Sequence, residues 1–432
     1  VPVSPKNVFP SNIQGLPTWY EVRLSEKGYL GRRGGADFII AVNGQSLRDD
    51  YDMVQPGGYF LYDSTRELPA DFTRDDITVI DIPLTRLCND EYTDNRMRQL
   101  MKNIIYIGAL AYLLDIGLEP VSDSIRTQFA KKPKLADPNI RALEIGFDYA
   151  QQHHRDSCGL KVKPSNAVGD QILVDGNSGA ALGALFGGAT VVGWYPITPS
   201  TSVVEAFERF GARYRIDPDT GARRYAAIQA EDELAAVGIA IGAGWNGARA
   251  FTATSGPGIS LMSEFLGLAY FTEIPVVLIN VQRSGPSTGM PTRTQQSDLL
   301  SCAYASHGDT RNVLLFPSDP HECFEMTADS FDLAERLQTP IIVMSDLDLG
   351  MNDHLCKPFS WDDNRCYDRG KVLSGEDLDR IEKKWGRYLD VDKDGICYRT
   401  LPGAHPEKGA YTTRGTSHTE YAAYTEGSAA YE

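Results

Sequence analysis

The sequence lacks the features that would place it in a membrane, outside the cell or among disulfide-rich proteins. A membrane-spanning helix needs roughly 18 to 20 apolar residues, and the longest apolar run, residues 104–118, is interrupted by Asp115. The first residues contain no basic segment followed by an apolar one, so nothing marks export. The seven cysteines include no C-x-x-C pair, which favours reduced thiols and gives no iron–sulfur ligand pattern. We therefore expect a cytoplasmic protein.

An excess of basic charge is also missing. The chain has 42 Lys and Arg residues against 58 Asp and Glu residues, a formal net charge of -16. This balance argues against sequence-independent binding to nucleic acids or to anionic membranes. The 432 residues, of which 42% are hydrophobic, are enough for about two or three domains with sizeable cores.

The hydrophobic pattern predicts an α/β protein in three parts. Residues 1–165 alternate strand-like and helical runs, which is typical of a mixed α/β domain. Residues 171–355 predict a doubly wound domain, with strands at 189–194, 248–254, 275–281, 312–316 and 340–345. Residues 356–432 are charged and turn-rich, and we interpret them as a connector and the start of an incomplete C-terminal domain.

Four polar loops follow the ends of apolar runs in the middle part. The first is Tyr195-Pro196-Ile197-Thr198-Pro199, and the others cover residues 229–236, 254–258 and 282–292. An open α/β sheet binds its ligands at the carboxyl ends of its strands, so the four loops together predict one site. Alone, the first would be an ordinary turn with a Ser or Thr helix cap.

On these four motifs the sequence closely resembles the α-type subunits of the 2-oxoacid:ferredoxin oxidoreductases, which are thiamine-diphosphate enzymes. The resemblance is specific from about 177 to 353 and extends more weakly into the γ-type domain that this family often carries in front. It implies a γ-type domain at 1–165 and a domain at 171–355 that binds the pyrimidine half of the coenzyme. The Gly-rich segment that usually opens the γ-type domain is not visible, so the chain is expected to be clipped at its start.

The resemblance also assigns site residues. It implies that Glu231 is the catalytic carboxylate at the pyrimidine ring nitrogen, and that Thr198, Arg283 and Thr292 bind the substrate. The residues expected to bind the coenzyme are Tyr195, Pro196, Ile197, Glu231, Ser255 and Gly256.

Simpler interpretations remain open for the charged residues. The three acids at 231–233 could serve only to stabilise the first turn of a helix. Arg283 could form a salt bridge at a strand end, and for Arg293 we prefer that interpretation.

No metal site is expected in this chain. A diphosphate and Mg²⁺ site in this coenzyme class has a Gly-Asp-Gly motif, and Lys393-Asp394-Gly395 is a poor substitute. Residues 390–395 imitate part of a calcium loop, but Leu401 stands where a Glu is needed, so we expect a turn stabilised by an Asp side chain. The resemblance implies a β-type partner that brings the diphosphate half, Mg²⁺ and a [4Fe-4S] cluster, in a dimer of heterodimers.

The expected reaction is the oxidative decarboxylation of a 2-oxoacid with coenzyme A, giving acyl-CoA, CO2 and reduced ferredoxin, or the reverse reductive carboxylation used in CO2 fixation. The fused layout favours 2-oxoglutarate as substrate. Alternatives are a subunit acting on pyruvate or on aryl or branched-chain oxoacids, and a non-catalytic scaffold subunit.

Overall fold

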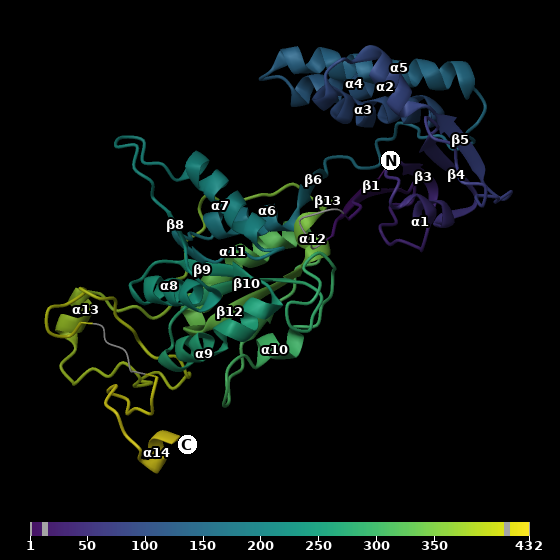
Figure 1. Cartoon of the computed structure of the whole chain (residues 1–432). Coiled ribbons are helices and arrows are strands. Elements are labelled where there is room, and N and C mark those ends of the chain that lie inside the picture. The colour runs from purple at the N-terminus through teal and green to yellow at the C-terminus, as the bar shows by residue number, and fades with distance from the viewer. Residues whose placement is uncertain (1, 11–15, 410–414, 432) are drawn as a thin grey trace. The chain divides into compact units, whose positions relative to one another are not determined.

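A computed structural model describes residues 2–10, 16–409 and 415–431 of the chain (Figure 1). It divides into two compact units. The N-terminal unit is built around residues 23–169, and the C-terminal unit contains residues 170–432 together with 4–11 and 18–22. No helix among the described residues is both long and apolar enough to cross a membrane.

The N-terminal unit has a three-stranded parallel sheet in the order β3-β4-β5. Alternate residues of β4 face opposite sides, so Phe60 packs on the side of α1 while Leu61 joins the core beneath α2, α3 and α5. Its elements are β3 (Ala36–Ala41), α1 (Leu47–Asp52), β4 (Val54–Asp63), β5 (Thr78–Ile82), α2 (Leu84–Glu91), α3 (Asn95–Leu113), α4 (Glu119–Gln128), η1 (Pro133–Leu135) and α5 (Ala136–His153).

Two glycines allow α3 and α5 to pack with their backbones in contact. A Cβ atom on Gly108 would lie 1.9 Å from the carbonyl oxygen of Leu143, and one on Gly146 would lie 1.8 Å from that of Ile105. Any larger residue would force the helices apart, so the sequence sets this close helix pair directly.

The C-terminal unit contains a six-stranded sheet in the order β11-β12-β10-β9-β7-β8, with every neighbouring pair parallel. Both β10 and β12 are buried along their whole length, as is typical of the mostly apolar central strands of a parallel sheet. The strands are β7 (Val191–Trp194), β8 (Ala226–Gln229), β9 (Ala250–Thr254), β10 (Val276–Gln282), β11 (Val313–Leu315) and β12 (Pro340–Asp346).

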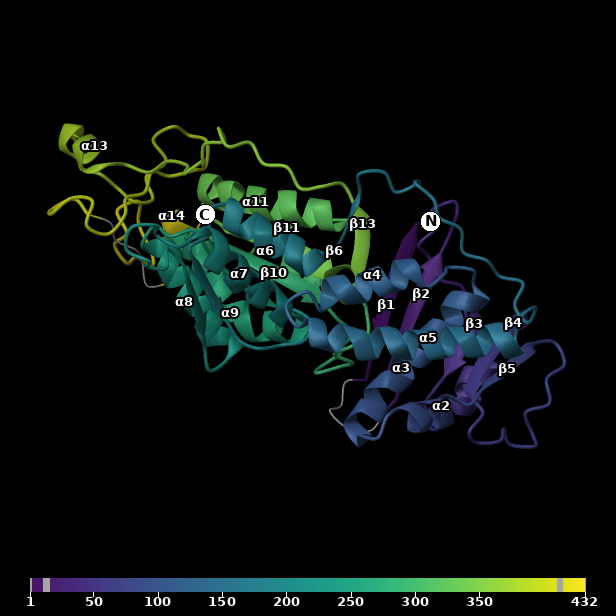
Figure 2. The same cartoon turned by 90° about the horizontal axis from the view of Figure 1, so that it is seen from above.

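Helices cover both faces of this sheet, as the doubly wound fold predicts (Figure 2). One face packs on α6, α7 and α11, and the other on α8, α9 and α10. The helices are α6 (Gly176–Phe186), α7 (Thr201–Tyr214), α8 (Glu233–Trp245), α9 (Gly256–Thr272), α10 (Leu299–Ala303), α11 (Pro320–Leu337) and α12 (Leu347–Met351). The predicted α/β fold class is confirmed.

Smaller elements complete the unit. The strands β6 (Ile172–Asp175) and β13 (Asp353–Cys356) pair antiparallel, and β1 (Val3–Val8) pairs with β2 (Trp19–Leu24). Two short helices, α13 (Gly375–Arg380) and α14 (Ser428–Tyr431), lie in the C-terminal segment.

The segment after Cys356 belongs to the C-terminal unit. Arg399 pairs with Glu335 of α11 at 3.2 Å, and Arg387 pairs with Glu273 at 2.9 Å. Both arginine side chains are almost fully buried, so these ion pairs hold the segment against the doubly wound domain. The three-part division at 165 and 355 stays a prediction.

The expected five strands were one too few, because β8 was missed. Its four residues, Ala-Ala-Ile-Gln, are too few and too poor in β-formers to stand out in the sequence. The turn expected at 390–395 is present, since the Asp390 carboxylate accepts hydrogen bonds from the amides of Lys393, Asp394 and Gly395.

Candidate functional site

The four polar loops meet at the carboxyl ends of the strands of the six-stranded sheet, because all its strands are parallel. We call this end of the sheet, where the loops lie, the sheet edge. Tyr195 follows β7, Ala230 follows β8, Ser255 follows β9 and Arg283 follows β10. From β7 the chain first runs out to the edge strand β8 and then crosses back to β9 on the other side. The sheet therefore has its topological switch point between β7 and β9, where ligands bind in open α/β folds.

The turn after β7 is held by internal hydrogen bonds. The amide of Ile197 donates to Oγ1 of Thr201 at 3.0 Å, and the hydroxyl of Ser200 donates to the carbonyl of Ile197 at 3.1 Å. Asn177, which is fully buried on α6, donates to the carbonyl of Pro199 at 2.9 Å. Ser200 occupies the N-cap position without making the capping bond, so the simple helix-cap interpretation is wrong.

The residues expected to face a ligand remain accessible on this turn. Tyr195 and Ile197 are half-buried and Pro196 is exposed. The half-buried Thr198 hydroxyl forms no hydrogen bond within the described chain, whereas the Thr198 carbonyl accepts one from Arg283. The turn thus has a fixed backbone and a free hydroxyl.

The three acids after β8 take three different positions. Glu231 is exposed, and its carboxylate makes no hydrogen bond or ion pair with any described residue. Asp232 is the N-cap of α8 and accepts from the amide of Ala235 at 2.7 Å. Glu233 is buried, at 7% exposed. The helix-stabilising interpretation therefore describes Asp232, while Glu231 stays open to a ligand.

The loop after β9 contains buried hydroxyls without partners. Ser255 is fully buried, and neither its Oγ nor the Oγ1 of Thr254 has a hydrogen-bond partner among the described residues. A Cβ on Gly256 would lie 3.0 Å from a carboxylate oxygen of Asp298, so a larger residue there would require that carboxylate to shift. Buried polar atoms normally have partners, and their lack here is consistent with a binding site.

Sequence reasoning missed two residues below this loop. Burial raises the pKa of Asp298, and a 3.1 Å hydrogen bond from Asn280 opposes that rise. Asn280 is fully buried in the middle of β10. Burying a side-chain amide in an otherwise apolar strand costs free energy. This departure from the apolar pattern could have identified Asn280 from the sequence.

Arg283 joins two of the loops. It is only 6% exposed, and it donates from Nη1 to the carbonyl of Thr198 at 2.6 Å and from Nη2 to that of Thr288 at 2.9 Å. Its Nε has no partner within the described ranges. Burial lowers the pKa of Arg283, and attraction to Glu233 opposes this effect. The alternative of a strand-end surface salt bridge is therefore wrong.

Thr292 and Arg293 form a second link. Thr292 is buried, and its Oγ1 accepts a hydrogen bond from Nη1 of Arg293 at 3.1 Å. The same Nη1 donates to the carbonyl of Phe9 at 2.8 Å. The surface salt bridge preferred for Arg293 is thus wrong, because its partners are a hydroxyl and backbone carbonyls.

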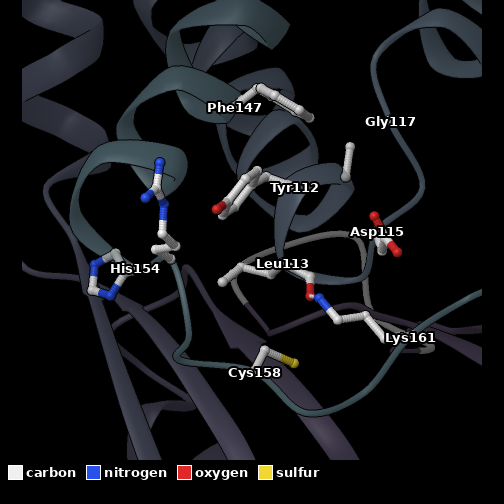
Figure 3. A pocket seen from close by; sticks show the side chains of 10 residues that line it. Tyr112, Leu113, Asp115, Gly117, Phe147, His154, Cys158 and Lys161 are labelled. Carbon is white, nitrogen blue, oxygen red and sulfur yellow. Dashed lines mark hydrogen bonds between the residues drawn. The ribbon is translucent and has the colours of Figure 1, made fainter.

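A separate pocket of about 190 Å³ lies within the N-terminal unit (Figure 3). Two polar side chains that line this pocket already form hydrogen bonds with backbone carbonyls. Lys161 donates to the carbonyl of Leu113, and His154 forms a hydrogen bond with the carbonyl of Asp81. Burial raises the pKa of the Cys158 thiol, which also lines the pocket and is therefore a poor nucleophile.

Two family models match the chain. Residues 182–353 match the thiamine-diphosphate-binding domain of pyruvate flavodoxin/ferredoxin oxidoreductases, and residues 1–149 match the pyruvate ferredoxin/flavodoxin oxidoreductase family. The first match covers all four loops of the sheet edge, and together the two define the class as an oxidoreductase subunit with a thiamine-diphosphate-binding domain.

The names of individual relatives agree with this class. The chain is 30% identical over 460 residues to subunit alpha of the 2-oxoacid:ferredoxin oxidoreductase 2 of Aeropyrum pernix, covering 96% of this chain and 70% of the relative. It is 29% identical to the 2-oxoglutarate oxidoreductase subunit KorA of Mycobacterium tuberculosis, covering 76% of this chain and 52% of the relative. The chain thus spans between about half and about two thirds of the length of these relatives.

A solved structure shows the same fold. The 2-oxoglutarate:ferredoxin oxidoreductase from Magnetococcus marinus, with 2-oxoglutarate, coenzyme A and succinyl-CoA bound, matches with a TM-score of 0.84 and 29% identity over 99% of this chain and 71% of that chain. The chain belongs to the family of 2-oxoacid:ferredoxin oxidoreductase alpha subunits. The resemblance inferred from the four motifs is confirmed.

Proposed function

We propose that this chain is the alpha subunit of a thiamine-diphosphate-dependent enzyme that decarboxylates a 2-oxoacid oxidatively with coenzyme A, or runs the reverse carboxylation. The observation that carries the proposal is the sheet edge itself. There the buried Arg283 holds the Thr198 turn, and the unpartnered Glu231 follows the adjacent strand β8.

The residues at this edge fit the pyrimidine half of the coenzyme. Glu231 is exposed and free to accept a hydrogen bond from a ring nitrogen, and the unpartnered hydroxyl of Ser255 lies in the next loop. Tyr195, Pro196, Ile197 and Gly256 would complete the contact surface. When bound, the coenzyme supplies the electron sink that decarboxylation needs and that no side chain offers. The catalytic role of Glu231 is to hold the pyrimidine in its proton-accepting form.

The substrate is bound by hydrogen-bond donors in the same proposal. Arg283 is held rigidly by two carbonyls, and its guanidinium would supply the positive charge that attracts the carboxylate of a 2-oxoacid. A charged donor in a buried site gives a strong hydrogen bond. The free hydroxyl of Thr198 and the hydroxyl of Thr292, which already accepts from Arg293, can donate to the same molecule.

We assign the other half of the site to a partner. Relatives named as subunit alpha support a multi-subunit enzyme. In our proposal a β-type subunit brings the diphosphate-binding half, Mg²⁺ and a [4Fe-4S] cluster, and ferredoxin exchanges electrons with that cluster. The assembly is a dimer of such pairs in the cytoplasm.

We propose 2-oxoglutarate as the substrate. Support comes from the bound 2-oxoglutarate and succinyl-CoA in the Magnetococcus marinus structure and from relatives named for 2-oxoglutarate. Another support is the 2-oxoglutarate synthase subunit KorA of Methanothermobacter thermautotrophicus, which is 44% identical over 177 residues, 41% of this chain and 45% of that protein.

The test is an assay of the complex purified with its β-type partner. We expect reduction of ferredoxin that depends on coenzyme A and is fastest with 2-oxoglutarate, when pyruvate and branched-chain oxoacids are compared. The Glu231→Ala variant should lower kcat at least about 100-fold without preventing assembly. Unchanged activity of that variant would favour the scaffold alternative, and a preference for another oxoacid would overturn the substrate assignment.

A further inference from the structure

Asp298 lies between two loops of the sheet edge, and the proposed function so far gives it no role. It follows the loop of residues 282–292 in the chain, and its carboxylate lies against Gly256, the first residue of α9. A Cβ on Gly256 would stand 3.0 Å from one oxygen of that carboxylate and 3.1 Å from the other. The carboxylate therefore fills the space in which a side chain at position 256 would lie.

Two side chains of β10 hold Asp298 in place. Nδ2 of Asn280 donates to Oδ2 of Asp298 at 3.1 Å, and Oε1 of Gln282 accepts from the backbone amide of Asp298 at 3.1 Å. Gln282 is itself fixed, because its Nε2 donates to the carbonyl of Ser345 in β12 at 3.1 Å. Asn280 and Gln282 are both almost fully buried. The carboxylate thus cannot move aside without losing a hydrogen bond from a rigid central strand.

The strand register places this support directly beneath the loop after β9. Asn280 pairs with Thr254 across the two parallel strands, and Ser255 and Gly256 are the next residues along the chain. Ser255 is the N-cap of α9 but makes no capping hydrogen bond. The three atoms nearest to a Cβ on Gly256 all belong to Asp298. A residue distant in sequence therefore supports the first turn of α9, which has no side-chain cap of its own.

We propose that Asp298 is a positioning residue that acts through Gly256 and fixes the first turn of α9 where the coenzyme binds. This inference rests on the proposed function, in which Ser255 and Gly256 contact the pyrimidine half. A loop that is already fixed loses less conformational entropy on binding than a mobile one, so the support from Asp298 strengthens coenzyme binding. The support comes from packing contact, and an asparagine of the same shape would provide it as well.

The experiment titrates thiamine diphosphate, with Mg²⁺ present, into the assembled complex from which the coenzyme has been removed, and measures the heat of binding. For Asp298→Ala we expect the Kd of thiamine diphosphate to rise about ten-fold, because the turn loses its support. Asp298→Asn keeps the shape and the acceptor for Asn280, so its Kd should stay within about two-fold of wild type. Asp309→Ala, the same truncation at an exposed aspartate, should leave Kd unchanged.

A double-mutant cycle tests whether Asp298 acts through Gly256. Gly256→Ala alone should weaken coenzyme binding, because its methyl group displaces the carboxylate. In the Asp298→Ala background the methyl group has room, so the added loss of affinity should be at least about three-fold smaller. Equal losses in the two backgrounds would overturn the inference.

A merely structural role would lower the thermal stability of Asp298→Ala and leave its Kd for thiamine diphosphate at the wild-type value, and that result would also overturn the inference. So would a rise in Kd for Asp298→Asn as large as that for Asp298→Ala. If Asp298→Ala does not assemble, Asp298→Ser removes the same carboxylate and the same rise is expected. A wild-type complex that binds no thiamine diphosphate would contradict the proposed function instead, so the two failures are distinguishable.

Discussion

Single residues at this sheet edge have both a structural role and a proposed functional role, and Arg283 is the clearest case. Its two Nη atoms donate hydrogen bonds to backbone carbonyls of two different loops, and its Nε has no hydrogen-bond partner within the described ranges. The loops and the proposed substrate site therefore depend on the same side chain, which is why a lysine could not replace it without loss.

We predict that Arg283→Met lowers stability and also weakens substrate binding. Loss of the guanidinium leaves the carbonyls of Thr198 and Thr288 without a donor, which should cost about 1–3 kcal/mol of stability. It also removes the charged partner of the substrate, so KM of the assembled complex should rise at least about 100-fold. Thermal unfolding and steady-state kinetics measure the two effects, and an unchanged KM would contradict the substrate role of Arg283.

The sequence predicts some residues of the site better than others. Ser255 and Arg283 directly follow β9 and β10, and Thr198 lies four residues after the end of β7, so strand ends locate them. The burial of Glu233 could not be predicted, because three consecutive acids look alike until the helix direction and the packing of Gly258 are known. The contact of Arg293 with Phe9 joins residues 284 positions apart, which no local pattern reveals.

At the scale of elements, glycines determine how closely the helices of the C-terminal unit pack. The helices α6 and α11 lie side by side (Figures 1 and 2), and a Cβ on Gly183 would come within 2.2 Å of the carbonyl oxygen of Phe324. Glycine at this position therefore allows the backbones of the two helices to come into close contact.

We predict that Gly183→Ala destabilises the protein by about 1–3 kcal/mol, because the new methyl group meets backbone that cannot move aside. Gly242→Ala in α8 is the matched control, since no atom of the described residues lies within 4 Å of the Cβ that alanine would add there. Alanine favours the helix there, so stability should stay the same or rise by up to about 1 kcal/mol. Chemical denaturation measures both, and equal effects would contradict the packing argument.

Elements were predictable where the hydrophobic pattern was strong. The buried strands β10 and β12 consist mostly of apolar residues, and their predicted bounds differ from the observed ones by one residue at most. The edge strand β8 was missed because its residues have weak strand preference, and only pairing with β7 makes it a strand.

At the scale of the whole molecule, the sheet edge of this chain carries one part of the proposed active site. Glu231 is accessible there and has no partner among the described residues, and the proposal places the diphosphate half of the coenzyme on a β-type partner. The chain spans 52% of the KorA relative and 71% of the matched solved chain.

The most direct measurement is the structure of the assembled complex with thiamine diphosphate bound. Our account predicts that the Glu231 carboxylate lies within about 3 Å of the pyrimidine ring nitrogen, with the diphosphate held by the partner subunit. A structure in which Glu231 points into solvent, away from the coenzyme, would contradict the account.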